Sequence, residues 1–191
     1  MTSLQDFVDT GALLEGHFRL SSGLHSDRYL QCARLLMWPA RAEAAGRDLA
    51  SRLTEFGPKL IVSPAMGGVV IGHETARALG IPFLFAERVD GAFALRRGFR
   101  LEPGDLVAVV EDVFTTGKST REVVELCAAS KARVLAAGSI VDRGMPAAAL
   151  TVPSRSLLSL SVPAWPQGEC PLCKEGRPLE TPGSRFAAAK P

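Results

Sequence analysis

The chain has 191 residues, of which 47% are hydrophobic and 22% charged, with a formal net charge of +2 at pH 7. This length suits one compact domain, and the scattered Lys and Arg residues form no basic tract that would indicate nucleic acid as a partner. No stretch approaches the ~18 consecutive apolar residues of a membrane helix and the first residues lack a signal-peptide pattern, so we expect a cytoplasmic protein with no membrane partner.

The first third of the chain predicts two helices on either side of a hairpin. Residues 3–13 form a short amphipathic pattern that we expect to end near Gly11 or Gly16. Residues 18–31 alternate apolar and polar side chains around a Ser-Ser-Gly turn, which predicts a hairpin. Residues 39–56 have helical spacing, and Gly57 and Pro58 end that helix.

From residue 59 the pattern changes to strands that alternate with helices. This alternation predicts an α/β fold with a mostly parallel central sheet flanked by helices, in a single domain over residues 1–191. Residues 87–104 are expected to be a long connection, and the chain from residue 163 is expected to be loop-like. The expected strands are residues 59–62, 81–86, 106–110, 134–141 and about 156–162, with helices ending at residue 79 and spanning 119–129.

The segment that carries the chemistry reads VVEDVFTTGKST over residues 109–120. An apolar strand ends in Glu111 and Asp112, and a loop rich in hydroxyl groups then opens a helix. Ligands of open α/β sheets bind at the carboxyl ends of the strands, and helix N-terminal amides bind phosphate. Two acids beside a phosphate cradle fit a ligand that also offers hydroxyl groups, such as ribose 5-phosphate.

Two other interpretations of this segment are weaker. A P-loop requires Gly five residues before Gly117, and Asp112 occupies that position. A capped helix without a ligand explains Ser119 or Thr120, but it does not explain two successive acids followed by several hydroxyl side chains.

Residues 109–119 resemble the phosphoribosyl pyrophosphate motif of type I phosphoribosyltransferases, and other segments resemble the bacterial orotate phosphoribosyltransferases among them. Residues 16–23, with Ser26 and Tyr29, resemble their N-terminal hood, and residues 64–68 their pyrophosphate loop. Residues 140–143 resemble their orotate-contacting strand end, and residues 170–176 the tail of one bacterial branch. The resemblance implies a small hood formed by about residues 1–35 and the C-terminal region.

The resemblance also implies a reaction and its participants. Orotate would be converted with phosphoribosyl pyrophosphate to orotidine 5-phosphate and pyrophosphate in pyrimidine (UMP) biosynthesis. The cofactor would be Mg²⁺, held mainly through substrate oxygens and not by a protein metal site. The protein would be a homodimer in which each mobile loop covers the partner's site. The alternatives are another purine or pyrimidine phosphoribosyltransferase and a nucleotide-sensing regulatory relative.

Roles follow for individual residues from the same resemblance. Asp112, Arg96 and Arg97 would be catalytic, and Thr115 and Arg143 would contact orotate. An Arg suits orotate because its planar fork matches two acceptors at once. The residues that would bind phosphoribosyl pyrophosphate are Arg88, Glu111, Asp112, Val113, Phe114, Thr115, Thr116, Gly117, Lys118 and Ser119.

The chain departs from the family pattern at three cationic positions. Members of the family usually carry Lys on the mobile loop, whereas residues 87–103 here contain four Arg residues and no Lys or His. Arg does not give up a proton near neutral pH, so we expect Arg97, helped by Arg96, to neutralise pyrophosphate and not to donate a proton. Gly67 and Ser21 likewise stand where Lys is common.

The cysteine and histidine residues suggest ordinary roles. Cys32 and Cys127 are expected to be buried thiols. A single CxxC at Cys170 and Cys173 is weak evidence for zinc, so a structural turn is favoured over a partial metal site, and a redox pair ranks third. The three histidines, His17, His25 and His73, are expected to have structural or surface roles and not to be arranged as metal ligands.

Overall fold

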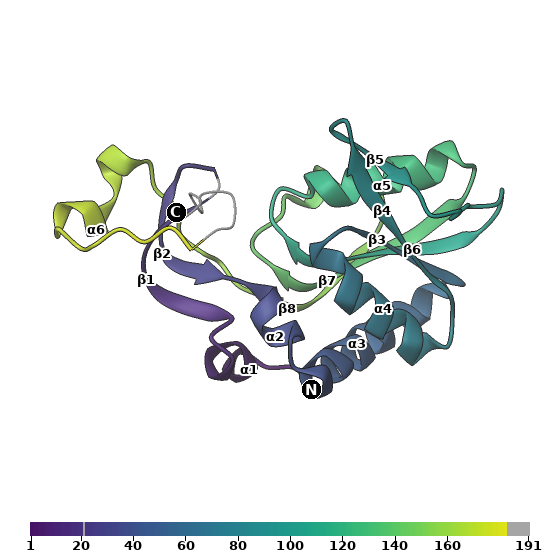
Figure 1. Ribbon diagram of the computed structural model, residues 1–191, viewed down its shortest axis with the longest axis horizontal. Coiled ribbons are helices and arrows are strands. Elements are labelled where there is room, and N and C mark those ends of the chain that lie inside the picture. Colours follow the sequence, from purple (N-terminus) through teal and green to yellow (C-terminus); the bar gives the residue numbers. More distant parts are fainter. Residues whose placement is uncertain (21, 183–191) are drawn as a thin grey trace.

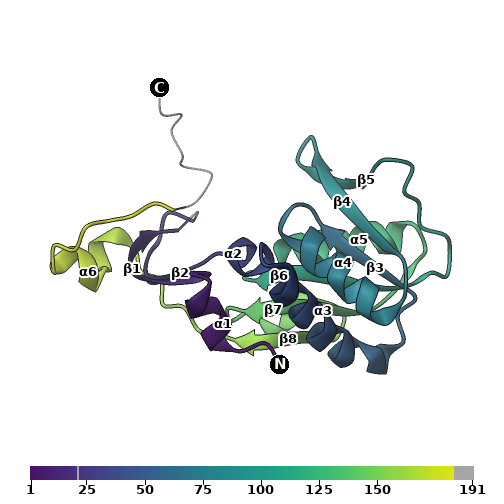
Figure 2. The ribbon, with the colours of Figure 1, turned by 60° about the horizontal axis from the view of Figure 1, so that its bottom comes forward.

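The computed structural model describes residues 1–20 and 22–182 and consists of an α/β body and a smaller lobe. Figures 1 and 2 both show the first strands and the C-terminal segment together at one end of the molecule, with the body at the other. We call the smaller lobe the hood; it comprises residues 1–20, 22–31 and 163–182. Ser21 lies outside the described residues, so its departure from the family pattern stays a prediction.

The body contains a six-stranded sheet in the order β5-β4-β3-β6-β7-β8. Every neighbouring pair is parallel except β4 and β5, which confirms the predicted mostly parallel sheet. The strands are β3 (Leu60–Pro64), β4 (Phe83–Val89), β5 (Ala92–Leu95), β6 (Leu106–Phe114), β7 (Arg133–Asp142) and β8 (Ser154–Ser159).

Helices cover both faces of this sheet. On one face lie α3 (Pro39–Leu53) and α4 (Gly67–Leu79), and on the other lies α5 (Lys118–Ala129). Strand β6 supplies both layers by alternation, because Ala108 and Val110 pack with α3 and α4 whereas Val107 and Val109 pack with α5. The continuous apolar run at residues 106–110 therefore forms the predicted central strand.

The hood is built on an antiparallel hairpin of β1 (Leu13–Arg19) and β2 (His25–Leu30). The predicted hairpin is confirmed, but it begins five residues earlier than expected, because α1 (Leu4–Asp9) ends before Gly11, which has a φ of +64°. A short helix, α2 (Cys32–Leu36), links the hood to α3. The C-terminal segment, residues 163–182, pairs with the hairpin at two isolated bridges, Phe18 with Glu180 and His25 with Trp165.

Three further expectations need correction. Residues 87–104 are not one loop, because β5 pairs with β4 as a hairpin that adds an edge strand. The C-terminal segment is not entirely loop-like, since it contains one 3₁₀ turn (Gln167–Glu169) and α6 (Pro171–Lys174). Strand β6 continues to Phe114, so Glu111 and Asp112 lie within the strand and pair alongside β7. Among the described residues, no helix has the length and apolar character needed to cross a membrane.

Candidate active site

Two adjacent carboxyl groups lie near the carboxyl end of β6. Burial raises the pKa of Glu111 to about 7, although its carboxylate accepts a hydrogen bond from the Thr120 hydroxyl. Burial also raises the pKa of Asp112, whose Oδ1 accepts a hydrogen bond of 2.9 Å from the Val113 amide. Because a buried charge is costly without hydrogen-bond partners, both groups favour a ligand that donates hydroxyl hydrogens.

The turn after β6 forms an open helix start. Gly117 is the N-cap of α5 with a φ of +72°, and a Cβ there would lie 2.8 Å from the Met145 sulfur. The first hydrogen bond of the helix runs from the Arg121 amide to the Gly117 carbonyl at 2.9 Å. The amides of residues 118–120 therefore have no acceptor within the helix. They lie at the N-terminus of α5, which is the positive end of the helix dipole, so this position suits a phosphate.

The predicted phosphate-binding residues divide by the direction of their side chains. Thr115 and Thr116 are exposed at the turn, and Ser119 is half-buried in the first turn of α5. Phe114 is fully buried and could contact a ligand only through backbone atoms, whereas Val113 is half-buried and packs against the core. Thr120, the last hydroxyl side chain of the segment, lies on the buried face of α5 and donates to Glu111.

Arg143 follows β7 and lies beside this strand end. Its amide donates to the Phe114 carbonyl at 2.9 Å, which joins the two strand ends. Burial lowers the pKa of the guanidinium, and its Nε is buried without a hydrogen-bond partner among the described residues. A buried donor of this kind is costly unless a ligand supplies an acceptor, which a carboxylate or a ring carbonyl does.

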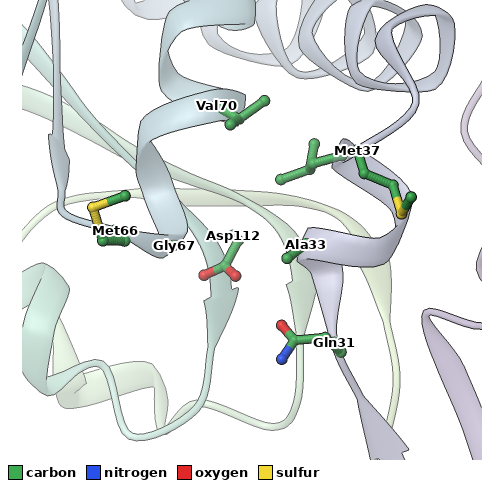
Figure 3. A pocket seen from close by; sticks show the side chains of 8 residues that line it. Gln31, Ala33, Met37, Met66, Gly67, Val70 and Asp112 are labelled. Carbon is green, nitrogen blue, oxygen red and sulfur yellow. The ribbon is translucent and has the colours of Figure 1, made fainter. Parts of the chain in front are cut away.

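A cavity of about 470 Å³ opens where Asp112 faces the start of α4. In Figure 3 the Asp112 carboxylate points into it, between Gly67 and Ala33. A Cβ on Gly67 would lie 2.7 Å from Oδ1 of Asp112, so the glycine is what allows the carboxylate to lie against the helix start. The cavity is lined by Gln31, Ala33, Leu36, Met37, Met66, Gly67, Val70 and Asp112.

The predicted catalytic arginines are not brought to these acids within one chain. Arg97 makes a two-pronged contact with Glu87, with both N···O distances at 3.0 Å, and its side chain is 62% exposed. Arg96 is also exposed. They follow β5, which is three strand positions from β6, a separation of about 14 Å at the usual spacing between strands.

Arg88, the remaining predicted loop contact, is held beside α5. Its guanidinium pairs with Glu122 at 2.7 Å, donates to the Gly91 carbonyl at 2.7 Å and lies 4.2 Å from the Phe93 ring centroid. It still acts on the site electrostatically, because its charge opposes the rise in the pKa of Glu111.

Sequence reasoning missed the contribution of α2. Cys32, expected to be an ordinary buried thiol, lies 4.0 Å from the Asp112 carbonyl, and burial raises its pKa well above the usual range. Gln31 and Ala33 line the cavity. A five-residue helix between a hairpin and Pro39 carries no periodic signal, so this wall of the cavity could not be predicted from the sequence.

The expectation about the histidines is wrong for two of them. His17 and His25 are buried in the hood beside Cys170 and Cys173, and one potential metal-ligand atom of each lies within 4.8 Å of the others. His73 lies apart on α4, exposed against Phe83. The four residues come together only because the C-terminal segment returns to the hairpin.

Relatives and solved structures resemble this chain over most of its length. No protein-family model matches it. An orotate phosphoribosyltransferase of Thermotoga maritima is 51% identical over 176 residues, covering 92% of this chain and 94% of that protein. One of Chlorobium phaeobacteroides is 47% identical over 182 residues, covering 95% of this chain and 94% of that protein.

The solved structures extend the similarity to the fold. The crystal structure of orotate phosphoribosyltransferase from Aeropyrum pernix has a TM-score of 0.68 at 27% identity, covering 82% of this chain and 92% of that one. An adenine phosphoribosyltransferase from Thermoanaerobacter pseudethanolicus has a TM-score of 0.60 at 15% identity and covers 70% of this chain and 88% of that one, which shows a shared fold alone.

Proposed function

The chain belongs to the orotate phosphoribosyltransferase family, and from this premise we propose that it makes orotidine 5-phosphate from orotate and 5-phosphoribosyl 1-pyrophosphate in UMP biosynthesis. A ring nitrogen of orotate gives up its proton to solvent and bonds to the anomeric carbon, the bond from that carbon to pyrophosphate breaks, and pyrophosphate leaves with the electron pair of that bond. The observation that carries the proposal is the meeting of Glu111, Asp112, the start of α5 and the unpartnered Nε of Arg143 at one strand end. A cytoplasmic location is part of the proposal and rests on the composition of the sequence.

The sugar and its phosphate are held at β6 and α5. The ribose hydroxyls donate to Glu111 and Asp112, which supplies the partners that these buried carboxyl groups favour. The phosphate lies on the amides and hydroxyls of residues 115–119 at the N-terminus of α5. The negative charge of Asp112 also stabilises the positive charge that develops on the ribose as the bond breaks.

Orotate is recognised by Arg143, with Thr115 beside it. The guanidinium pairs with the carboxylate and the adjacent ring edge, which satisfies its buried Nε. Uracil lacks that carboxylate, and leaving the guanidinium without its charge partner costs roughly 2–5 kcal/mol. Orotate is therefore preferred over uracil and over the purine bases.

Departure of pyrophosphate depends on cations. Arg96 and Arg97 neutralise the leaving group, and neither acts as an acid, because Arg keeps its proton at neutral pH. The oxygen-only side chains of Glu111 and Asp112 fit Mg²⁺, which would be held mainly by substrate oxygens and would neutralise charge on pyrophosphate.

A homodimer would explain how the arginines reach an active site. Within one chain they lie about three strand spacings from β6, so we propose that each loop serves the partner's site. Large exposed apolar side chains beside the cavity, Met37, Met66 and Val70, support an interface on that side of the body. Sedimentation of the full chain tests this: a monomer at assay concentrations that retains full activity would contradict the shared loop.

A substrate panel tests the proposed reaction. With phosphoribosyl pyrophosphate and Mg²⁺ present, we expect loss of orotate absorbance and formation of pyrophosphate, with little turnover of uracil, adenine or hypoxanthine. Equal turnover of orotate and uracil would contradict the role of Arg143. Turnover of a purine base alone would place the protein with another branch of the phosphoribosyltransferases.

A further inference from the structure

A second group of reactive side chains lies in the hood, away from the active site. His17 comes from β1, His25 from β2, and Cys170 and Cys173 from the start and middle of the turn that contains α6. Their exposed fractions are 3% for His17, 2% for His25 and 0% for Cys170, and Cys173 is half-buried. The catalytic proposal uses none of these groups.

The distances among the four ligand atoms are short. His17 Nε2 lies 3.0 Å from His25 Nδ1, 3.5 Å from Cys170 Sγ and 3.6 Å from Cys173 Sγ. Cys173 Sγ lies 3.2 Å from His25 Nδ1. A tetrahedral Zn²⁺ with Zn–S bonds near 2.3 Å and Zn–N bonds near 2.05 Å separates its ligand atoms by roughly 3.3–3.8 Å. The cluster therefore has nearly the dimensions of a zinc site.

The surrounding hydrogen bonds fix which nitrogen of His17 faces the cluster. Its Nδ1 lies 2.9 Å from the Arg177 carbonyl oxygen, which can only accept, so Nδ1 carries the hydrogen. In the neutral ring, Nε2 then has one lone pair, yet it faces three polar neighbours. One lone pair satisfies one donor, whereas a cation at the centre satisfies all the ligand atoms together. A metal-binding His commonly donates its other ring N–H to a carbonyl in this way.

The backbone is arranged to hold the two halves of the cluster together. His25 and Trp165 exchange two backbone hydrogen bonds of 2.8 Å. Glu180 likewise donates to His17 and accepts from Arg19, both at 2.8 Å. Between these points the chain turns tightly, with the amides of Lys174 and Gly176 donating to the carbonyls of Cys170 and Cys173 at 3.3 and 3.0 Å. This turn brings both thiols to the same side.

The chemistry of the ligand set selects the ion. Two thiolates and two neutral imidazoles around a divalent cation give a complex with no net charge, which suits a buried position. Both thiols lose their protons when they bind the ion, because the thiolate is the ligand. Four protein ligands leave no open position for a substrate, and this closed Cys₂His₂ set is typical of structural zinc and not of catalytic zinc.

We propose that His17, His25, Cys170 and Cys173 bind one structural Zn²⁺ that fastens the C-terminal segment to the hairpin of the hood. Few apolar side chains are available for this purpose, since Leu172 is the buried aliphatic residue of α6. Small lobes of this kind commonly need a metal or a disulfide to be stable. Both cysteines are free thiols in the structure, so the metal is the link that the geometry supports.

Metal analysis of the untagged full-length protein, purified without chelators, tests the proposal. We expect one zinc ion per chain, and X-ray absorption at the zinc edge should show two sulfur ligands at about 2.3 Å and two nitrogen ligands at about 2.05 Å. A wild-type protein without zinc after growth in zinc-supplemented medium would overturn it. A Cys170–Cys173 disulfide in the untreated protein, or a zinc ion surrounded only by oxygen and nitrogen, would also overturn it.

Matched variants locate the ion. Cys173→Ser should reduce bound zinc to near zero, whereas Cys127→Ala and His73→Ala should keep it, because Cys127 lies on the buried face of α5 and His73 lies on α4. If Cys173→Ser retains one zinc ion per chain, the assignment fails. Should that variant not fold, Co²⁺ exchanged into the wild-type protein must still give the visible bands of a tetrahedral thiolate site, and their absence would overturn the proposal.

The structural role has its own readout. Stripping zinc from the wild-type protein should speed tryptic cleavage after Lys174, because the turn would lose its attachment to the hairpin. Cleavage at unchanged rates would show that the ion does not fasten the segment. The test is independent of the transferase proposal, since it requires neither substrate nor turnover.

Discussion

The strand end at β6 and the His–Cys cluster of the hood assemble their groups in different ways. At β6, Glu111, Asp112 and the start of α5 lie within nine residues of one another in sequence, and Arg143 joins them from the end of β7. In the hood, His17 and Cys173 are 156 residues apart and meet only because the C-terminal segment returns to the hairpin. A local cradle depends on charge and conformation at a few adjacent positions, whereas the cluster depends on the whole chain being folded.

Substitutions in these two regions should therefore have different effects. Changes at the strand end should lower turnover with little loss of stability, because the groups there are buried at a cost and do not hold the fold together. Changes in the cluster should loosen the C-terminal segment first. Substitutions in the body test the expected effect on turnover.

Asp112→Asn should have the largest effect. It keeps the shape of the side chain and removes the charge that faces the ribose, so we expect kcat to fall by ~10²-fold or more. Because burial raises the pKa of Asp112, loss of the charge should leave the melting temperature unchanged or higher. Asp105→Asn, just before the other end of β6, is the control and should leave turnover unchanged. Near-normal turnover in Asp112→Asn would show that the acid is not catalytic.

Arg143→Ala should come next. Loss of the guanidinium should lower kcat/KM for orotate about 30-fold, which corresponds to ~2 kcal/mol of lost transition-state stabilisation. Turnover of uracil should stay low and change little, so the preference for orotate should shrink. Arg155→Ala, an exposed arginine on β8 that pairs with Glu55, provides the comparison. An unchanged preference would remove Arg143 from the base site.

Gly67→Ala tests the close approach of Asp112 to α4. The added Cβ would lie 2.7 Å from Oδ1 of Asp112, so the carboxylate must move by several tenths of an ångström. A misplacement of that size should lower kcat about tenfold. Gly168→Ala places its Cβ in open space and should have no effect. Equal activity of the two variants would mean that the position of this carboxylate is not critical.

Arg97 tests the loop. Arg97→Ala should lower kcat about fivefold, a loss of ~1 kcal/mol, with a smaller change in orotate binding, because the contact strengthens as pyrophosphate leaves. Arg97→Lys keeps the charge and should retain more activity than the alanine variant. Unchanged activity of both variants would shift the role to Arg88 or Arg100, the other arginines of the loop besides Arg96.

Glu111 should give the smallest effect on stability, a pH dependence that is measured without substrate. Its folded pKa of about 7 lies above the value of 4.5 for an unperturbed glutamate, so the folded protein binds more protons than the unfolded chain between these values. Stability should therefore decline as pH rises from about 4.5 to 7, with a slope of at most ~1.4 kcal/mol per pH unit from this group. Glu111→Gln should remove that slope in urea titrations, and the exposed Glu125→Gln should not.

The α/β body could be predicted from the sequence because its signals are local. The apolar run before Glu111 and the helical spacing of residues 39–56 each indicate one element, and alternation of strands and helices orders them. Extension of β6 through Glu111 and Asp112 could not be read in this way, since pairing with β7 keeps these acids in the strand. Strand β5 was missed because its four residues are too few to form a periodic pattern, and only pairing with β4 makes them a strand.

The contents of the hood could not be predicted for a different reason. A CxxC motif alone does not indicate zinc, and His17 and His25 do not lie at a spacing typical of metal ligands. The bridges of His25 to Trp165 and of Phe18 to Glu180 create the site, and no local pattern records them. The close contact between Gly67 and Asp112 is also tertiary. Gly67 stands where Lys is common in the family, and the structure shows that its missing side chain leaves room for the Asp112 carboxylate.

A crystal structure of the wild-type protein with orotidine 5-phosphate tests the central claim most directly. We expect the phosphate on the amides of residues 115–119, the ribose hydroxyls on Glu111 and Asp112, and the base carboxylate on the Arg143 guanidinium. A nucleotide bound away from the end of β6, or one whose carboxylate leaves Arg143 without a partner, would contradict the account.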